Sequence, residues 1–152
     1  MRRKESWVMT IRPVTEDTVS AWAQLAARVW HSNSETLRQA FLAGQFPYEF
    51  LYWQGEDAVG VISLSLRQDY VEGSHNRPTA FLEGIYVLPN YRKQGLASAM
   101  VDYAKAWACQ QGVQQLASNC ELANEVSQAF HQSLGFQEVS RTVHYLMDTA
   151  VD

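Results

Sequence analysis

The stretch AFLEGIYVLPNYRKQGLASAM, residues 80–100, joins an apolar run to a basic loop and then to a helical pattern. Residues 80–88 are almost all apolar, which predicts a strand buried on both faces, with Glu83 as its one acid. Apolar residues then recur at helical spacing, which predicts a helix over 95–111 that stops at Gly112. This succession of strand, loop and helix is typical of an α/β fold.

The loop inside this stretch has the features of an anion-binding site. The first N–H groups of a helix lack partners within it, and the helix dipole favours negative charge there. Arg92 and Lys93 add positive charge, while Gly95 and Ala97 leave the backbone open to a ligand. The alternative is a basic turn in which the glycine serves only the chain geometry. The loop has neither GK[ST] nor GxGxxG, so it is not a nucleotide-binding loop of those two kinds.

Patterns on either side of this stretch predict the remaining elements. Helices are expected with Thr15 as the first cap, with a capping box from Ser32 to Glu35, and near the C-terminus. In the third strand apolar residues alternate with Ser63, Ser65 and Arg67, which predicts one solvated face. The order is β-α-α-β-β-β-α-β-α-β, so we expect a mixed central sheet flanked by helices. The expected strands are 7–13, 49–53, 58–69, 80–88, 114–120 and 137–147, and the expected helices are about 15–30, 32–44, 95–111 and 124–134.

Length and composition favour a single soluble domain. The chain has 152 residues, is 47% hydrophobic and carries a formal net charge of −4, which argues against nucleic acid as a partner. No apolar run reaches the roughly 18 residues that span a membrane. Residues 1–8 lack the apolar core of a signal peptide, so we expect an N-terminal extension followed by a domain over 9–152. Cys109 and Cys120 form no CxxC pair, which indicates free thiols, no metal and a cytoplasmic protein.

Two further motifs carry a resemblance to a known family. Arg92-x-x-Gly95-x-Ala97 resembles the acetyl-CoA pyrophosphate loop of the GNAT superfamily of N-acetyltransferases, and FHQSLGF (130–136) resembles its closing helix. FLEGIYVLP (81–89), with DYVEG (69–73) and LASN (116–119), is similar to aminoglycoside 6′-N-acetyltransferases. The resemblance implies the GNAT fold, transfer of acetyl from acetyl-CoA to the 6′-amine of an aminoglycoside in a ternary complex, antibiotic resistance, and a homodimer.

The resemblance also implies the residues that hold acetyl-CoA. The backbone of Ile85, Tyr86 and Val87 is expected to pair with the pantetheine arm, as an added strand would. Asn124 matches a cofactor contact, although it can equally cap the last helix. The pyrophosphate is expected at Arg92, Lys93, Gln94, Gly95, Leu96, Ala97 and Ser98.

Two residues are candidates for proton transfer. A carboxylate at Glu83, in a strand predicted to be buried, needs partners, so it either takes the proton of the substrate amine or is a structural acid. The resemblance assigns Glu83 to the substrate site. His131 occupies the place of a tyrosine acid in related enzymes, so it either protonates the leaving thiolate or only contacts the cofactor.

The other predicted substrate contacts are Trp30, Asp69, Tyr70 and Asn119. Trp30 suits stacking on a sugar or packing in the core, and Asp69 and Tyr70 suit a cationic sugar or a solvated strand end. Related enzymes usually carry Asp where this chain has Asn119, which cannot act as a base. Rival functions are acetylation of another amine, such as a polyamine or a protein N-terminus, and a catalytically silent acetyl-CoA-binding domain.

Overall fold

In the computed structural model, which describes residues 9–75 and 77–150, the chain divides into two compact units. The first unit runs to Asn119 and the second begins at Cys120. The second unit contains α4 (Glu125–Ser133). The first contains β1 (Met9–Pro13), α1 (Val19–Trp30), α2 (Ser34–Leu42), β2 (Tyr48–Gln54), β3 (Asp57–Arg67), β4 (Thr79–Val87), the 3-10 turn η2 (Pro89–Tyr91), α3 (Leu96–Gln110) and β5 (Leu116–Ala117).

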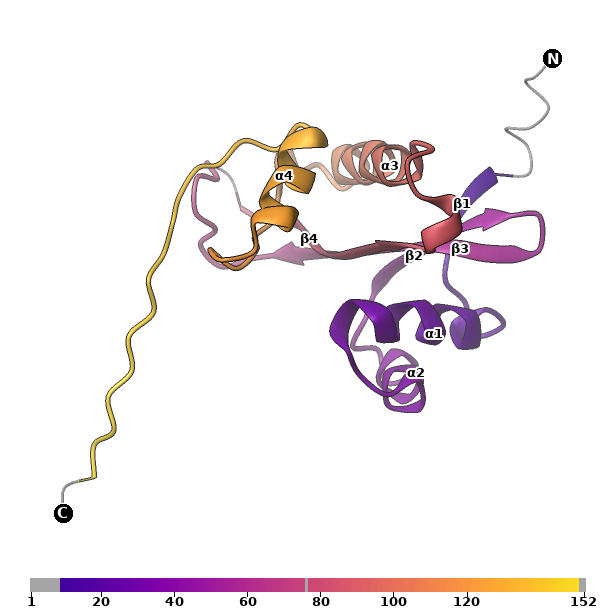
Figure 1. Ribbon diagram of the computed structural model, residues 1–152, viewed down its shortest axis with the longest axis horizontal. Helices are drawn as coiled ribbons and strands as arrows, with labels where there is room; N and C mark the ends of the chain where they lie inside the picture. Colours follow the sequence, from indigo (N-terminus) through magenta and orange to yellow (C-terminus); the bar gives the residue numbers. More distant parts are fainter. Residues whose placement is uncertain (1–8, 76, 151–152) are drawn as a thin grey trace. The chain divides into compact units, whose positions relative to one another are not determined.

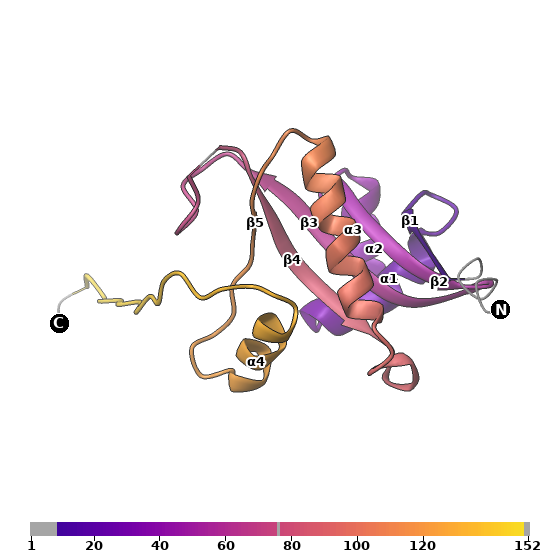
Figure 2. The same cartoon turned by 90° about the horizontal axis from the view of Figure 1, so that it is seen from above.

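The first unit is built on one five-stranded sheet in the order β1-β2-β3-β4-β5. The first four strands are antiparallel neighbours, and β5 runs parallel to β4. Helices α1 and α2 cover one face of the sheet and α3 covers the other (Figures 1 and 2). The predicted mixed sheet flanked by helices is therefore confirmed.

Apolar residues at helical spacing fix α1 to its face of the sheet. Trp22, Leu25 and Ala26 are buried in a cluster that also contains Leu51 of β2. An ideal Cβ built at Gly84 would lie 2.5 Å from Val29 Cγ1 of α1, closer than side chains pack. Glycine at this position therefore lets α1 approach β4 closely.

The helix caps differ from two predictions. The residue that precedes α1 is Thr18 rather than Thr15, and its side-chain oxygen accepts a hydrogen bond from the Thr15 amide. Helix α2 is capped by Asn33 rather than Ser32: Asn33 Oδ1 accepts hydrogen bonds from the amides of Glu35 at 2.8 Å and Thr36 at 3.1 Å. Asn33 is the cap because its single side-chain oxygen accepts hydrogen bonds from two backbone amides of the first turn.

The strands depart from the predictions in their burial. The predicted solvated face of β3 is wrong at Ser63, which is 3% exposed because its hydroxyl bonds to a buried acid of β2. In β4 residues 79–82 and Val87 are buried, residues 84–86 are half-buried, and Glu83 faces a partly open site. The predicted strand over 114–120 shrinks to Leu116–Ala117.

The second unit holds a short helix and an irregular segment. Residues 134–150 form neither helix nor strand, so the predicted strand over 137–147 is wrong. Tyr145, which lies in this segment, is 91% exposed. An alternating pattern cannot form a strand without a hydrogen-bonding neighbour, and none is provided within the described residues.

No helix in residues 9–75 and 77–150 is long and apolar enough to span a membrane.

Candidate active site

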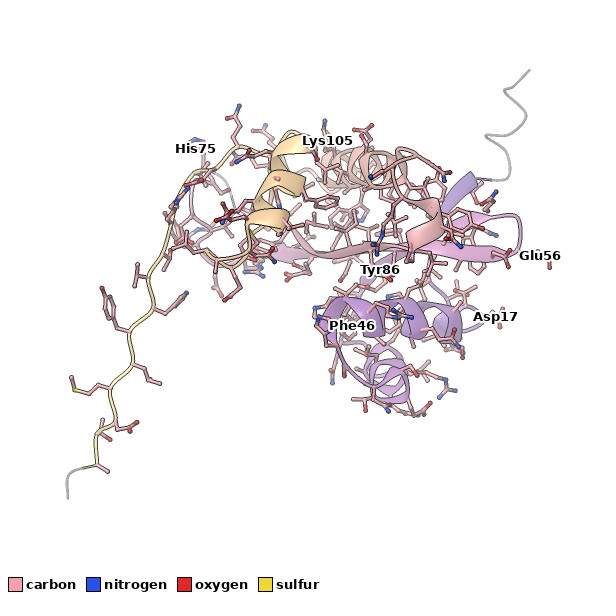
Figure 3. The ribbon with its side chains drawn as sticks, viewed as in Figure 1. Asp17, Phe46, Glu56, His75, Tyr86 and Lys105 are labelled. Carbon is pink, nitrogen blue, oxygen red and sulfur yellow. The ribbon has the colours of Figure 1, made fainter. Side chains whose placement is uncertain are left out.

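A pocket of about 260 Å³ lies on the face of the sheet that α1 and α2 cover. Aromatic and apolar groups form one side of it, and hydroxyl and carboxyl groups form the other. Figure 3 labels one of its aromatic residues, Phe46, which follows α2 in the chain. The pocket is lined by Trp30, Gln45, Phe46, Pro47, Glu49, Ser63, Leu64, Ser65 and Glu83.

Glu83 enters this pocket from a β-bulge. Ser63 of β3 pairs with Gly84, whereas the next residue, Leu64, pairs with Leu82, so Glu83 is the extra residue of β4. A bulge of this kind bends a strand and redirects a side chain, and bulges are common beside active sites. The irregularity of β4 thus explains why this acid points into the pocket.

The carboxylate of Glu83 is held by two neighbours on β3. Arg67 Nη2 donates to Glu83 Oε1 at 2.9 Å and Arg67 Nε donates to Oε2 at 3.1 Å, while Ser65 Oγ donates to Oε2 at 2.5 Å. The side chain is 30% exposed, so the prediction of a buried acid is wrong. A carboxylate has about four acceptor positions, so Glu83 can still bind an ammonium group.

A second acid, Glu49 of β2, lines the same pocket and is only 3% exposed. Trp22 Nε1 donates to Glu49 Oε1 at 2.8 Å, and Ser63 Oγ donates to Glu49 Oε2. Burial raises the pKa of Glu49 from 4.5 to about 8; the hydrogen bonds from Ser63 and Trp22 oppose this shift, and the charge of Glu83 adds to it. The pocket therefore contains two acids that differ in environment: Glu49 is buried and has a raised pKa, whereas Glu83 is partly exposed and paired with an arginine.

The opposite wall of the pocket is aromatic. The ring of Phe46 lies 5.4 Å from that of Trp30 and 5.0 Å from that of Trp22, measured between centroids. Aromatic faces of this kind suit the C–H surface of a sugar ring, while the carboxyl groups suit its amines. The pocket can therefore hold an amino sugar.

Of the predicted substrate residues, the structure brings Trp30 and Glu83 together in this pocket. The other three do not line it. Asp69 and Tyr70 lie in the loop that follows β3, where Tyr70 is 63% exposed, and Asn119 is exposed after β5.

The N-terminus of α3 has the form expected of an anion site. Gly95 precedes the helix with a φ of 86°, a conformation that glycine adopts without strain, and no side chain caps the first turn. Part of the Arg92 guanidinium group is already engaged within the protein, because its Nε donates to the Val87 carbonyl at 2.8 Å. Gln94 similarly donates to the Asn90 carbonyl, whereas Lys93 is exposed.

The remaining residues of the predicted pyrophosphate site differ in exposure. Leu96 is buried in the core, while Ala97 is half-buried and Ser98 is exposed. At Leu96 the buried side chain is out of reach of a ligand, which leaves only the backbone of this residue. The uncapped amides and small side chains here fit the pyrophosphate of acetyl-CoA.

The edge of β4 is open where an extended ligand is predicted. Strand β5 pairs with β4 only at Ala80 and Phe81. Among the described residues no strand pairs with Ile85 or Val87 on that side, so their edge can accept an added strand. Tyr86 projects from β4 toward the face that α1 covers (Figure 3) and packs against the core cluster there.

Asn124 and His131 lie in the second unit. Asn124 Oδ1 accepts a hydrogen bond from the Ser127 amide at 3.0 Å, so it caps α4 as one of its two predicted roles requires. His131 Nδ1 lies 2.7 Å from the Ser127 carbonyl oxygen, and its ring packs against Phe136. Their contact with a cofactor remains a prediction.

The sequence analysis did not identify several residues of the site, among them Phe46, Glu49, Ser65 and Arg67. Glu49 stands in YEFLYW (48–53), an acid within an apolar strand. The same signal drew attention to Glu83 and could have identified Glu49. Nothing in the sequence indicated that Arg67 pairs with Glu83, because this pairing depends on the strand register.

Comparison with known proteins identifies the family of this chain. The acetyltransferase (GNAT) family matches residues 14–136. An aminoglycoside N(6′)-acetyltransferase type 1 of Acinetobacter baumannii is 35% identical over 141 residues, covering 90% of this chain and 97% of that protein. The crystal structure of an aminoglycoside 6′-N-acetyltransferase from the same species is 33% identical with a TM-score of 0.83, covering 93% of this chain and 99% of that one.

A second solved structure was determined with a ligand. It is an aminoglycoside 6′-N-acetyltransferase in complex with the bisubstrate analogue CoA-S-monomethyl-acetylneamine, with 30% identity and a TM-score of 0.83. The similarity covers 92% of this chain and 98% of that chain. By its fold, its site and these relatives, the chain belongs to the GNAT family of acetyltransferases, in the group of the aminoglycoside 6′-N-acetyltransferases.

Proposed function

We propose that this protein transfers the acetyl group of acetyl-CoA to the 6′-amine of aminoglycoside antibiotics and so confers resistance to them. The observation that carries the proposal is the pocket in which Glu83 and Glu49 face Trp30 and Phe46. Acidic groups opposite aromatic rings fit a polycationic sugar. The relatives named above support the same substrate and the same position of transfer.

In this mechanism Glu83 prepares the amine for attack. Acetyl-CoA supplies the acetyl group as a thioester, and the amine arrives mostly as an ammonium ion that cannot attack it. Glu83 accepts a proton from that ion, directly or through water, while Arg67 and Ser65 hold the carboxylate in place. The neutral amine then attacks the thioester carbonyl, the C–S bond breaks, and CoA leaves as a thiolate that takes up a proton from the solvent. Trp30 and Phe46 orient the sugar ring. The free edge of β4 around Ile85 binds the pantetheine arm.

Product analysis tests the proposed function. Kanamycin incubated with acetyl-CoA should gain its acetyl group on the 6′ nitrogen, as shown by NMR. An analogue with a hydroxyl group at 6′ should remain unchanged. Acetylation of another ring nitrogen, or of a polyamine in preference to kanamycin, would reject the proposal.

Replacement of Gly95 by alanine is expected to weaken acetyl-CoA binding by tenfold or more. A Cβ at this position would meet no protein atom within 4 Å, so its methyl group projects into open space at the helix start. That space is where the pyrophosphate is proposed to approach the backbone. Calorimetric titration with acetyl-CoA measures the loss.

The matched control is Gly112→Ala, at the other end of α3. Gly112 has a φ of +78° against +86° for Gly95, and it too has no atom near an added Cβ. Both substitutions therefore carry a similar backbone cost, about 1–2 kcal/mol in stability. Equal affinity of the two variants for acetyl-CoA would exclude Gly95 from the cofactor site.

We also propose that the protein is a homodimer. The support is the irregular C-terminal segment, in which Val143, Tyr145, Leu146 and Met147 are between 66% and 98% exposed. Side chains of this size are rarely left in water as a group, and a second copy can cover them. Light scattering should give twice the mass of one chain, and replacing both Tyr145 and Leu146 by aspartate should reduce it to one. A monomeric wild-type protein rejects the proposal.

A cytoplasmic location completes the proposed function. Cys109 and Cys120 are both free, which suits a reducing compartment. Acetyl-CoA is a cytoplasmic metabolite. Fractionation of cells that express the protein would test this location.

A further inference from the structure

We propose that Glu49 forms a second ammonium-binding position, which selects aminoglycosides that carry an amine at the 2′ position of the acetylated ring. This inference rests on the proposed function, because it takes the 6′-amine to be the reacting group at Glu83. Its basis is the position of two carboxyl groups on either side of β3 and, among the described residues, the absence of a cation paired with one of them.

The two acids lie on the strands on either side of β3, Glu49 on β2 and Glu83 on β4. Glu49 accepts its hydrogen bond from Ser63, and Glu83 accepts one from Ser65. Ser63 and Ser65 are two residues apart on β3, so they lie on the same face about 7 Å from one another and hold the two carboxyl groups at separate points on that face of the sheet. This spacing suits two amines on opposite sides of a single six-membered sugar ring.

The two acids differ in their partners. Glu83 is paired with Arg67, whereas no lysine, arginine or histidine of the described residues forms an ion pair with Glu49. Glu49 nevertheless lines the pocket while being 97% buried, and each of its oxygens accepts one hydrogen bond where it can accept two. A substrate ammonium group would supply the cation that the protein does not.

Binding of an ammonium ion at this position is coupled to the loss of a proton from Glu49. Because burial raises its pKa to about 8, the carboxyl group is mostly neutral at pH 7 in the empty pocket. The groups that face it are Trp22 of α1, Ser63 of β3 and the Glu83–Arg67 pair. An entering ammonium ion favours the charged carboxylate, so binding releases the Glu49 proton to the solvent.

Kanamycin A and kanamycin B provide a matched pair of probes, since they differ only in a hydroxyl group or an amine at 2′. We expect wild-type protein to bind kanamycin B at least tenfold more tightly than kanamycin A, because a charged hydrogen bond contributes about that factor. Glu49→Gln should remove this preference, with the affinity for kanamycin B falling at least tenfold more than the affinity for kanamycin A. Titrations at pH 7 in buffers of different ionisation enthalpy should show more protons released with kanamycin B by the wild type than by the variant.

A structural role of Glu49 gives a different result, since both affinities would then fall together in Glu49→Gln. The inference is overturned by that outcome, by an unchanged preference in the variant, or by a wild-type protein that binds the two antibiotics equally. Acetylation is measured separately. If neither kanamycin is acetylated at 6′ but the Glu49-dependent preference is found, the proposed function fails and the second ammonium position stands.

Discussion

Glu83→Gln is expected to lower kcat by about 10²–10⁴-fold with saturating kanamycin and acetyl-CoA at neutral pH. The substitution keeps the shape of the side chain and its hydrogen bond with Ser65 but removes the group that accepts the proton. Loss of a general base typically has an effect of this size. Affinity for the cationic substrate should also fall, because one negative charge leaves the pocket.

The dependence of this defect on pH separates catalysis from structure. At high pH more of the substrate amine is already neutral and needs no base. The variant should therefore recover relative to wild type as the pH rises from 6 to 9. Steady-state rates across this range, with substrate saturating at each pH, measure the recovery.

Glu35→Gln is the matched control for this experiment. Glu35 of α2 also binds an arginine, Arg38, at 3.2 Å, but it is exposed and does not line the pocket. Its substitution should leave kcat unchanged at every pH. If Glu83→Gln loses the same factor at pH 6 and pH 9, Glu83 does not accept the proton and serves to bind or to hold the strand.

Much of the fold could be predicted from local patterns. The basic loop before α3 and the apolar run of β4 are encoded in consecutive residues, so their physical meaning is visible in the sequence. Glu83 stood out for the same reason, as an acid in an apolar strand. The GNAT fold was expected from the family resemblance, which the comparison with known proteins confirmed.

The parts that were missed depend on contacts between distant residues. Glu49 and Ser63 are 14 positions apart, and Arg67 and Glu83 are 16 apart, so only the register of β2, β3 and β4 brings them together. A single extra residue in β4 decides that Glu83 is partly exposed. The segment 137–147 shows the same limit, because its alternating pattern does not identify a neighbouring strand.

The last prediction concerns stability and the buried acid of β2. Glu49→Gln should be more stable than the wild type at pH 8 by roughly 4 kcal/mol, and the two proteins should be nearly equal in stability at pH 4. The raised pKa of Glu49 sets the sign. Between pH 4.5 and about 8 the folded wild type holds a proton that the unfolded chain has lost, so its free energy of unfolding falls as the pH rises.

The size of the effect follows from the same shift. Each pKa unit corresponds to about 1.4 kcal/mol, so a shift from 4.5 to about 8 gives a total change of roughly 4–5 kcal/mol. Glutamine has no such proton, and its amide can still accept from Trp22 and donate to Ser63. Urea unfolding of both proteins from pH 4 to pH 9 measures the difference, in which the titration of all other groups largely cancels. A constant difference across this range would mean that the pKa of Glu49 is the same in the folded and the unfolded protein.

A stabilised Glu49→Gln variant bears on why the chain has an acid here at all. If the glutamate destabilises the folded state at neutral pH, packing and stability do not explain its presence in the core. Its position at the pocket beside Glu83 then makes binding of a cation the physical explanation. The two measurements on one variant can be read together: higher stability at pH 8 combined with loss of the preference for kanamycin B indicates a group maintained for its ligand. Higher stability with an unchanged preference would instead leave Glu49 as an acid that burial disfavours and the substrate does not use.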